Sequence, residues 1–189
     1  MTPKLLTLYH TGFQAIPVPD VHYGRKNADF GPGFYTSPDL EFSRRWARHR
    51  KGSTTWLNTY TLDLEGLWVA ALSRDAPWLD VLFANRSGDG DPLGDRDVVL
   101  GPIANDTLYD LLGVTTSGLL PRETAMEVLL LGPEYRQVVV KSEKAAARLT
   151  FRGAEVLDQE EVARYRAAVR AEEQDYQRRV GELLAADPD

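Results

Sequence analysis

Residues 21–39 bring glycines, aromatic rings, two cations and an amide together without the period of a helix or a strand. Gly31-Pro32-Gly33 interrupts regular structure, and glycine lets a backbone approach another group closely. After it, residues 33–37 predict a short strand, and Ser37-Pro38 predicts a helix start with Ser37 as the N-cap. Two interpretations stay open at this point. The stretch is either a loop that shapes a ligand site or an ordinary surface loop with a few buried rings.

The chain is long enough, at 189 residues, to form one domain with a full core. Its 43% hydrophobic and 26% charged residues are typical of a soluble globular protein. No apolar run approaches the roughly 20 residues of a membrane helix, so we expect no membrane partner. The first residues lack a signal-peptide pattern, and we therefore expect a cytoplasmic protein.

The absence of cysteine excludes disulfides and thiolate chemistry and argues against a structural zinc site. Three scattered histidines, His10, His22 and His49, predict no metal site. The net charge of −6 argues against general nucleic-acid affinity, although not against a local basic patch. The cations of residues 44–51 fit either a solvated helix face or a phosphate site.

Strand and helix patterns alternate irregularly along the chain, which favours an α+β fold over a doubly wound sheet. The acidic loop at residues 87–92 lacks the ligand spacing of a calcium site. We expect one domain over residues 1–157 and, over 158–189, a long helix that packs on the domain or on a partner. Predicted strands cover 4–10, 33–37, 54–63, 67–72, 97–102, 135–141 and 154–157, and predicted shorter helices cover 39–51, 76–86, 105–112, 121–131 and 142–149.

Three fragments carry polar groups at strand ends: Tyr9-His10-Thr11-Gly12, residues 29–46, and Tyr135-Arg136-Gln137. His10 alone is compatible with an ordinary core histidine, but its place at a strand end suits a site. Together the fragments resemble the ADP-ribosyltransferase superfamily, and specifically its bacterial group DUF3990, over most of residues 4–157. The resemblance implies a split two-sheet β core flanked by helices.

In the branch of that superfamily with a His-Tyr-Glu triad, His10 matches the histidine and Tyr35 the tyrosine. The resemblance implies that NAD is the co-substrate and that Tyr35 and Trp46 sandwich its nicotinamide ring. It also implies that His10 binds the adenosine ribose. Arg25 is expected to bind the diphosphate, because guanidinium suits phosphate geometry. The backbone of Thr11 would pair with the nicotinamide amide, Gly12 would leave room for it, and Asn27 and Phe34 complete the expected cofactor contacts.

The third triad position departs from the family pattern, because Gln137 stands where the superfamily has glutamate. An amide binds a ribose hydroxyl but cannot ionise, so it cannot act as a base or stabilise a developing cation as a carboxylate does. Glu134 is the nearest carboxylate, three residues earlier, which places it on the opposite face of a strand. Three options follow: the substrate supplies its own base, the nucleophile needs little activation, or NAD is bound without turnover.

The leading interpretation is an NAD-dependent mono-ADP-ribosyltransferase, an enzyme of the glycosyltransferase class that uses no metal. It would transfer ADP-ribose to a protein or nucleic-acid acceptor and release nicotinamide. By family analogy it would be the toxin of a toxin–antitoxin pair, with an antitoxin as partner. The alternatives are a non-catalytic NAD or ADP-ribose binding module, and a nucleic-acid-binding domain that uses residues 44–51.

Overall fold

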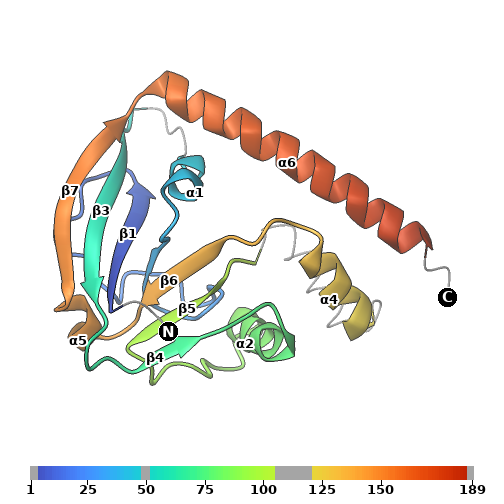
Figure 1. Cartoon of the computed structure of the whole chain (residues 1–189), viewed down its shortest axis with the longest axis horizontal. Helices are drawn as coiled ribbons and strands as arrows, with labels where there is room; N and C mark the ends of the chain where they lie inside the picture. The colour runs from blue at the N-terminus through green and yellow to red at the C-terminus, as the bar shows by residue number, and fades with distance from the viewer. Residues whose placement is uncertain (1–3, 48–51, 105–120, 187–189) are drawn as a thin grey trace.

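The computed structural model describes residues 4–47, 52–104 and 121–186, and its strands form two sheets (Figure 1). The first sheet is antiparallel, in the order β1 (Leu5–Gly12), β3 (Thr55–Asp63), β7 (Leu149–Leu157). The second has the order β2 (Phe34–Thr36), β6 (Arg136–Val140), β5 (Val98–Pro102), β4 (Val69–Ala71), with β4 and β5 parallel and the other pairs antiparallel.

The helices lie outside the two sheets. They are α1 (Leu40–Arg45), α2 (Ala76–Ser87), α4 (Arg122–Leu130), α5 (Glu143–Ala146) and α6 (Gln159–Ala186). In Figure 1 the long α6 runs from the end of β7 past α1 and on toward α4. The mixed α+β class, the two sheets and the long C-terminal helix are therefore as the sequence predicts.

Several predicted boundaries are wrong. The last strand begins at Leu149 instead of 154, because residues 149–153 pair with the second half of β3 across a register shift. Helix α1 is capped by Asp39, whose carboxylate accepts from the Phe42 amide at 3.0 Å, and not by Ser37. It ends at Arg45 with Trp46 as the C-cap. The predicted residues 48–51 of that helix and the predicted helix at 105–112 lie outside the described residues.

Strand β6 is buried on both faces and so joins two halves of the core. Val138 and Val140 pack with residues of the first sheet such as Leu8 and Tyr60. Val139 points the other way, into the cluster formed with α2. Because side chains alternate along a strand, Gln137 shares the face of Val139 and is directed toward the α2 side. The continuous valine run is typical of a strand covered on both faces.

Helix α6 packs on the domain as well as extending along it. Its residue Val162 joins a buried cluster with Ala47, Leu57 and Leu157. Farther along, the hydroxyl of Tyr176 donates to the Val128 carbonyl at 3.0 Å. The helix thus packs beside α1 and at α4, and between these places Glu172 pairs with Arg45 and accepts from the Tyr135 hydroxyl at 3.0 Å.

Asn58 holds the segment that follows β1, and its loss should destabilise the fold. Its fully buried amide donates to the carbonyls of His10 (3.3 Å) and Gln14 (3.1 Å) and accepts from the Ile16 amide (2.8 Å). We expect Asn58→Ala to lower the free energy of unfolding by about 2–3 kcal/mol, since buried partners lose their hydrogen bonds. Urea denaturation measures this change. Asn27→Ala, at an exposed asparagine, is the matched control, and an equal loss in both variants would contradict the assignment.

Candidate functional site

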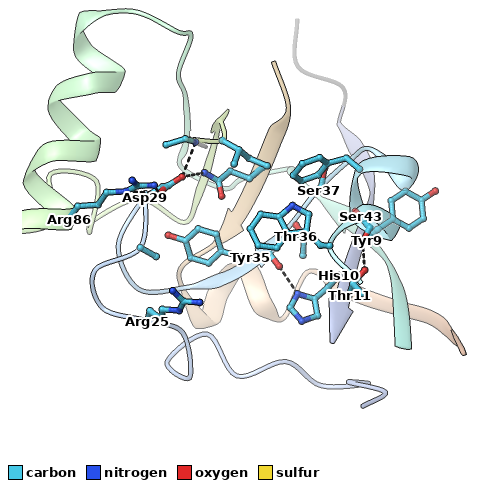
Figure 2. A pocket seen from close by; sticks show the side chains of 16 residues that line it. Tyr9, His10, Thr11, Arg25, Asp29, Tyr35, Thr36, Ser37, Ser43 and Arg86 are labelled. Carbon is cyan, nitrogen blue, oxygen red and sulfur yellow. Dashed lines mark hydrogen bonds and ion pairs between the residues drawn. The ribbon is translucent and has the colours of Figure 1, made fainter. Parts of the chain in front are cut away.

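A cavity of about 560 Å³ opens between α1, the end of β1, strands β2 and β6, and the loop before β2 (Figure 2). Six of the residues predicted for the site line it: His10, Thr11, Arg25, Tyr35, Trp46 and Gln137. Its volume lies within the range of small-molecule and cofactor sites. The cavity brings together the three residues predicted to be catalytic, which are spread over 127 positions of the sequence from His10 to Gln137.

The register of the second sheet places Tyr35 and Gln137 on one face. Tyr35 lies opposite Val139 in the antiparallel β2–β6 pair, so the two side chains point the same way. Gln137 is two residues before Val139 and shares its face. A bridge between Tyr9 and Ser37 joins the first sheet to this edge, with Tyr9 N to Ser37 O at 2.8 Å and Ser37 N to Tyr9 O at 2.9 Å. That bridge brings His10 to the cavity.

His10 is held in one tautomer by its neighbour. Its Nδ1 lies 2.7 Å from the Tyr35 carbonyl oxygen, which only accepts, so Nδ1 carries the proton and donates (Figure 2). The other nitrogen, Nε2, is then an acceptor. Burial lowers the pKa of His10 below its ordinary value, an effect that outweighs the hydrogen bond to Tyr35. At neutral pH the ring is therefore uncharged and accepts through Nε2, which suits a ribose hydroxyl.

The Tyr35 hydroxyl is occupied by the glycine loop. It donates to the Gly31 carbonyl at 2.7 Å and accepts from the Phe30 amide at 3.0 Å. Gly31 has a φ of +73°, a conformation that favours glycine. Burial raises the pKa of Tyr35, so it does not serve as a base. What the residue offers to a ligand is the face of its ring.

The opposite wall is formed by α1 and the end of β1. The Thr11 hydroxyl donates to the Ser43 carbonyl at 2.5 Å and ties the strand to the helix. The backbone amide and carbonyl of Tyr9 bond to Ser37, on the edge of β1 that faces away from β3. Along a strand, the backbone groups of successive residues face opposite edges. The amide and carbonyl of Thr11, two residues later, therefore face the same edge as those of Tyr9. Trp46 follows the helix, 40% exposed, with its ring edge-on to Phe42 at 5.9 Å.

Gln137 contacts a buried carboxylate that sequence reasoning did not assign to the site. Its Nε2 donates to Asp29 Oδ2 at 3.0 Å and to the Pro102 carbonyl at 3.4 Å. Asp29 Oδ2 also accepts from the Ala104 amide at 3.1 Å, and its Oδ1 accepts from Arg86 Nε at 2.9 Å. A carboxylate only accepts, so Nε2 must face Asp29. The amide oxygen, Oε1, is then the end of Gln137 through which a ligand hydroxyl could bind.

Three residues predicted to contact the cofactor, Gly12, Asn27 and Phe34, do not line the cavity. Phe34 is 7% exposed, packs in the core and backs His10 with a ring-centroid distance of 4.8 Å. Asn27 is exposed in the loop. At Gly12, an added Cβ would come within 3.3 Å of His10 Nε2, so the glycine leaves room beside the acceptor nitrogen.

Asp29 and Arg86 line the candidate site, and sequence reasoning did not assign them to it. Asp29 belongs to the stretch singled out at the start, but nothing in its local pattern indicates a buried carboxylate. Its partner Arg86 lies 57 positions later on α2 and reads as a last-turn cation. The predicted cationic face of α1 is also paired: Arg44 binds Glu155 at 3.1 Å, and Arg45 forms an ion pair with Glu172.

Comparison with known proteins identifies one family. Residues 6–151 match the family described as a protein of unknown function, DUF3990. The chain belongs to this family. No curated protein and no solved structure matches the chain. The assignment to DUF3990 made from Tyr9-His10-Thr11-Gly12 and the later fragments is therefore confirmed.

Within residues 4–47, 52–104 and 121–186, no three histidine or carboxylate side chains gather in a way that could hold a metal ion. Over the same residues, none of the helices has the length and apolar character to cross a bilayer.

The contact with Asp29 explains why an amide suits position 137. In Gln137→Glu two carboxylates would meet where Nε2 now donates at 3.0 Å. Repulsion between two carboxylates at this distance raises the pKa at which the pair loses its last proton. Near neutral pH the folded variant would therefore hold a proton that the unfolded chain has already released. We expect the variant to be least stable, relative to the parent, above about pH 6. The difference should shrink as pH falls toward 4. Thermal melts across this range measure it.

The exchange Asp29→Asn with Gln137→Glu is the matched control, because it restores one carboxylate and one amide. It should recover most of the lost stability at pH 7.5. Equal instability of the single and double variants at that pH would contradict the charge argument.

The state of His10 gives a pH prediction. Since its folded-state pKa is lowered, the unfolded chain binds the proton first, and stability falls as pH drops below the ordinary value of about 6.5. In an NMR titration of the imidazole signals, His10 should titrate below 6.5 and should show a bonded Nδ1 proton. His22, an exposed residue beside Glu143 at 3.1 Å, is the internal comparison. A His10 midpoint above 6.5 would overturn the neutral-acceptor role.

Proposed function

We propose that this protein is an NAD-dependent mono-ADP-ribosyltransferase, which transfers ADP-ribose to a macromolecular acceptor and releases nicotinamide. The observation that carries the proposal is the convergence of His10, Tyr35 and Gln137 on one cavity that Trp46 also lines. These residues come from β1, β2, β6 and the end of α1, and the family resemblance implies one site for all four.

The arrangement of strands supports an ADP-ribosyltransferase-like core. Two separate sheets meet at the Tyr9–Ser37 bridge, so the core is split. The histidine lies near the end of β1, the tyrosine in the middle of β2 and the glutamine near the start of β6. This is the order that the resemblance to that superfamily implies for its three triad positions.

The proposed complex assigns a group of the cavity to each part of NAD. The nicotinamide ring would lie between Tyr35 and Trp46, which both line the cavity, and each aromatic contact would contribute about 1 kcal/mol beyond burial. Its carboxamide pairs with the backbone of Thr11. His10 Nε2 accepts from the adenosine ribose, and Arg25, an exposed residue at the lining, binds the diphosphate.

The reaction breaks the bond between the nicotinamide nitrogen and ribose C1′. Both electrons pass to the pyridine ring, which leaves as a neutral molecule, so no general acid is required. The acceptor's nucleophile forms the new bond to C1′ and loses its proton to solvent. Gln137 Oε1 accepts from a hydroxyl of the nicotinamide ribose and fixes the sugar. The main contribution of the protein is positioning, which can supply several kcal/mol of barrier lowering.

A second candidate is a module that binds NAD or ADP-ribose without turnover. The observation that favours it is the bonding of Asp29, whose oxygens are engaged by Arg86, Ala104 and Gln137. Hydrogen bonds within the protein occupy both of its oxygens, so Asp29 is not placed to activate an acceptor. Toxin activity and an antitoxin partner stay predictions from the family resemblance.

Calorimetry with NAD and chromatography of released nicotinamide test both candidates. We expect Trp46→Ala to weaken NAD binding about tenfold, since stacking and burial together contribute somewhat more than 1 kcal/mol. Trp68→Ala removes another exposed tryptophan, which packs under Arg96 away from the cavity, and should leave binding unchanged.

The transferase is supported if nicotinamide is released with an acceptor present and His10→Ala abolishes the release. Binding without release, in the parent and with any acceptor in a cell lysate, would select the binding module. An absence of NAD binding at 1 mM, roughly the upper end of common substrate affinities, would contradict both.

A further inference from the structure

A second cavity of about 450 Å³ adjoins the first and is formed by α1, α6 and the segment before β6. The two cavities share four lining residues: Phe42, Trp46, Ile103 and Ala104. A ligand in the second cavity would therefore contact the same tryptophan that lines the first. This adjacency is what an acceptor site requires, because the nucleophile must reach the ribose carbon.

The second cavity is lined by more positive than negative side chains. Its arginines are Arg45, Arg74, Arg166 and Arg170, and its carboxylates are Glu172 and Glu173. Arg45 is paired with Glu172. The described lining therefore holds three further guanidinium groups against one further carboxylate, in a chain whose net charge is −6.

The three guanidinium groups are placed to receive an anion. Arg74 donates to the carbonyls of Gly132 (2.8 Å) and Pro133 (2.7 Å), which orient the group without neutralising its charge. Burial lowers the pKa of Arg74, because its positive charge has lost part of its contact with water. A bound anion would stabilise that charge. Arg166 and Arg170 are exposed and lie one helical turn apart on α6, on the side that lines the cavity.

Aromatic rings form the wall nearest the first cavity. Phe42 stacks on Tyr135 with ring centroids 4.4 Å apart and planes inclined by 27°. Trp46 stands edge-on to Phe42 and is 40% exposed. Flat apolar faces beside guanidinium groups are the combination by which proteins bind single-stranded nucleic acid, with bases on the rings and phosphates on the cations.

We propose that the second cavity is the acceptor site and that the acceptor is a single-stranded nucleic acid. This inference rests on the proposed transferase function and names its substrate class. The backbone phosphates bind Arg74, Arg166 and Arg170, and a base packs against Trp46. A base nitrogen or a terminal phosphate oxygen of the strand bonds to ribose C1′ as the bond to nicotinamide breaks. The leaving pair of electrons goes to nicotinamide, and any proton on the nucleophile passes to water.

Binding is tested without turnover by fluorescence anisotropy of a labelled 12-nucleotide single strand at several salt concentrations. The variant Arg166→Ala/Arg170→Ala removes two cavity cations from an exposed face where alanine favours helix. We expect about tenfold weaker binding. The slope of log affinity against log salt should fall by about 1.4, since each phosphate contact of a single strand contributes about 0.7.

The matched control is Arg164→Ala/Arg179→Ala, which removes the same charge from the same helix at positions outside the cavity lining. It should change affinity less than twofold. Equal losses in the two double variants, or no binding of the strand at 50 mM salt, would overturn the proposal.

Transfer is tested with labelled NAD, the full chain, and three acceptors: a 5′-phosphorylated strand, the same strand dephosphorylated, and a protein mixture. Label on both strands indicates a base as nucleophile, and label on the phosphorylated strand alone indicates the terminal phosphate. Label confined to protein would sink the nucleic-acid acceptor while the transferase stands. Strand binding that depends on Arg166 and Arg170, without nicotinamide release from any acceptor, would sink the transferase while the cavity remains a nucleic-acid site.

Discussion

The hydrogen bond from Gln137 to the buried carboxylate of Asp29 is the contact on which the site depends. Through Asp29 it joins the loop before β2, the first residues after β5, helix α2 and strand β6. The loop before β2 also contains Gly31, whose carbonyl accepts a hydrogen bond from the Tyr35 hydroxyl. The Tyr35 ring is therefore positioned by the same loop that carries Asp29. A carboxylate with these partners is stable in a buried place because each oxygen accepts hydrogen bonds and an arginine balances the charge.

This contact also gives a structural reason for the glutamine at position 137. From the superfamily resemblance alone, glutamine there would be interpreted as the loss of a catalytic carboxylate. In the folded chain it is the residue type that can sit beside Asp29, since an amide donates where a second carboxylate would repel. The carboxylate of the site is therefore Asp29, which contacts position 137, and not a side chain at position 137 itself. Asp29 fixes the orientation of the Gln137 amide, and in the proposed complex the amide oxygen binds the ribose of NAD.

Much of the fold follows from local patterns, and the site follows from the resemblance. Alternation and β-branched residues mark β3 and β6, and the Ser142 and Asp158 caps mark the starts of α5 and α6. The early part of β7 is missed because its strand state comes from pairing with β3, which is a tertiary effect. Asp29 and Arg86 are missed for the same reason, since neither residue's neighbours in sequence indicate the other. The second cavity likewise needs α6 to pack beside α1.

We propose that one cavity holds the nicotinamide ring of NAD between Tyr35 and Trp46 and binds the adenosine ribose at His10. A crystal structure of the full chain with NAD is the decisive test. We predict density for the pyridine ring between the two aromatic side chains and a ribose hydroxyl within hydrogen-bond distance of His10 Nε2. An empty cavity at a saturating NAD concentration, or a dinucleotide bound at another surface, would contradict it.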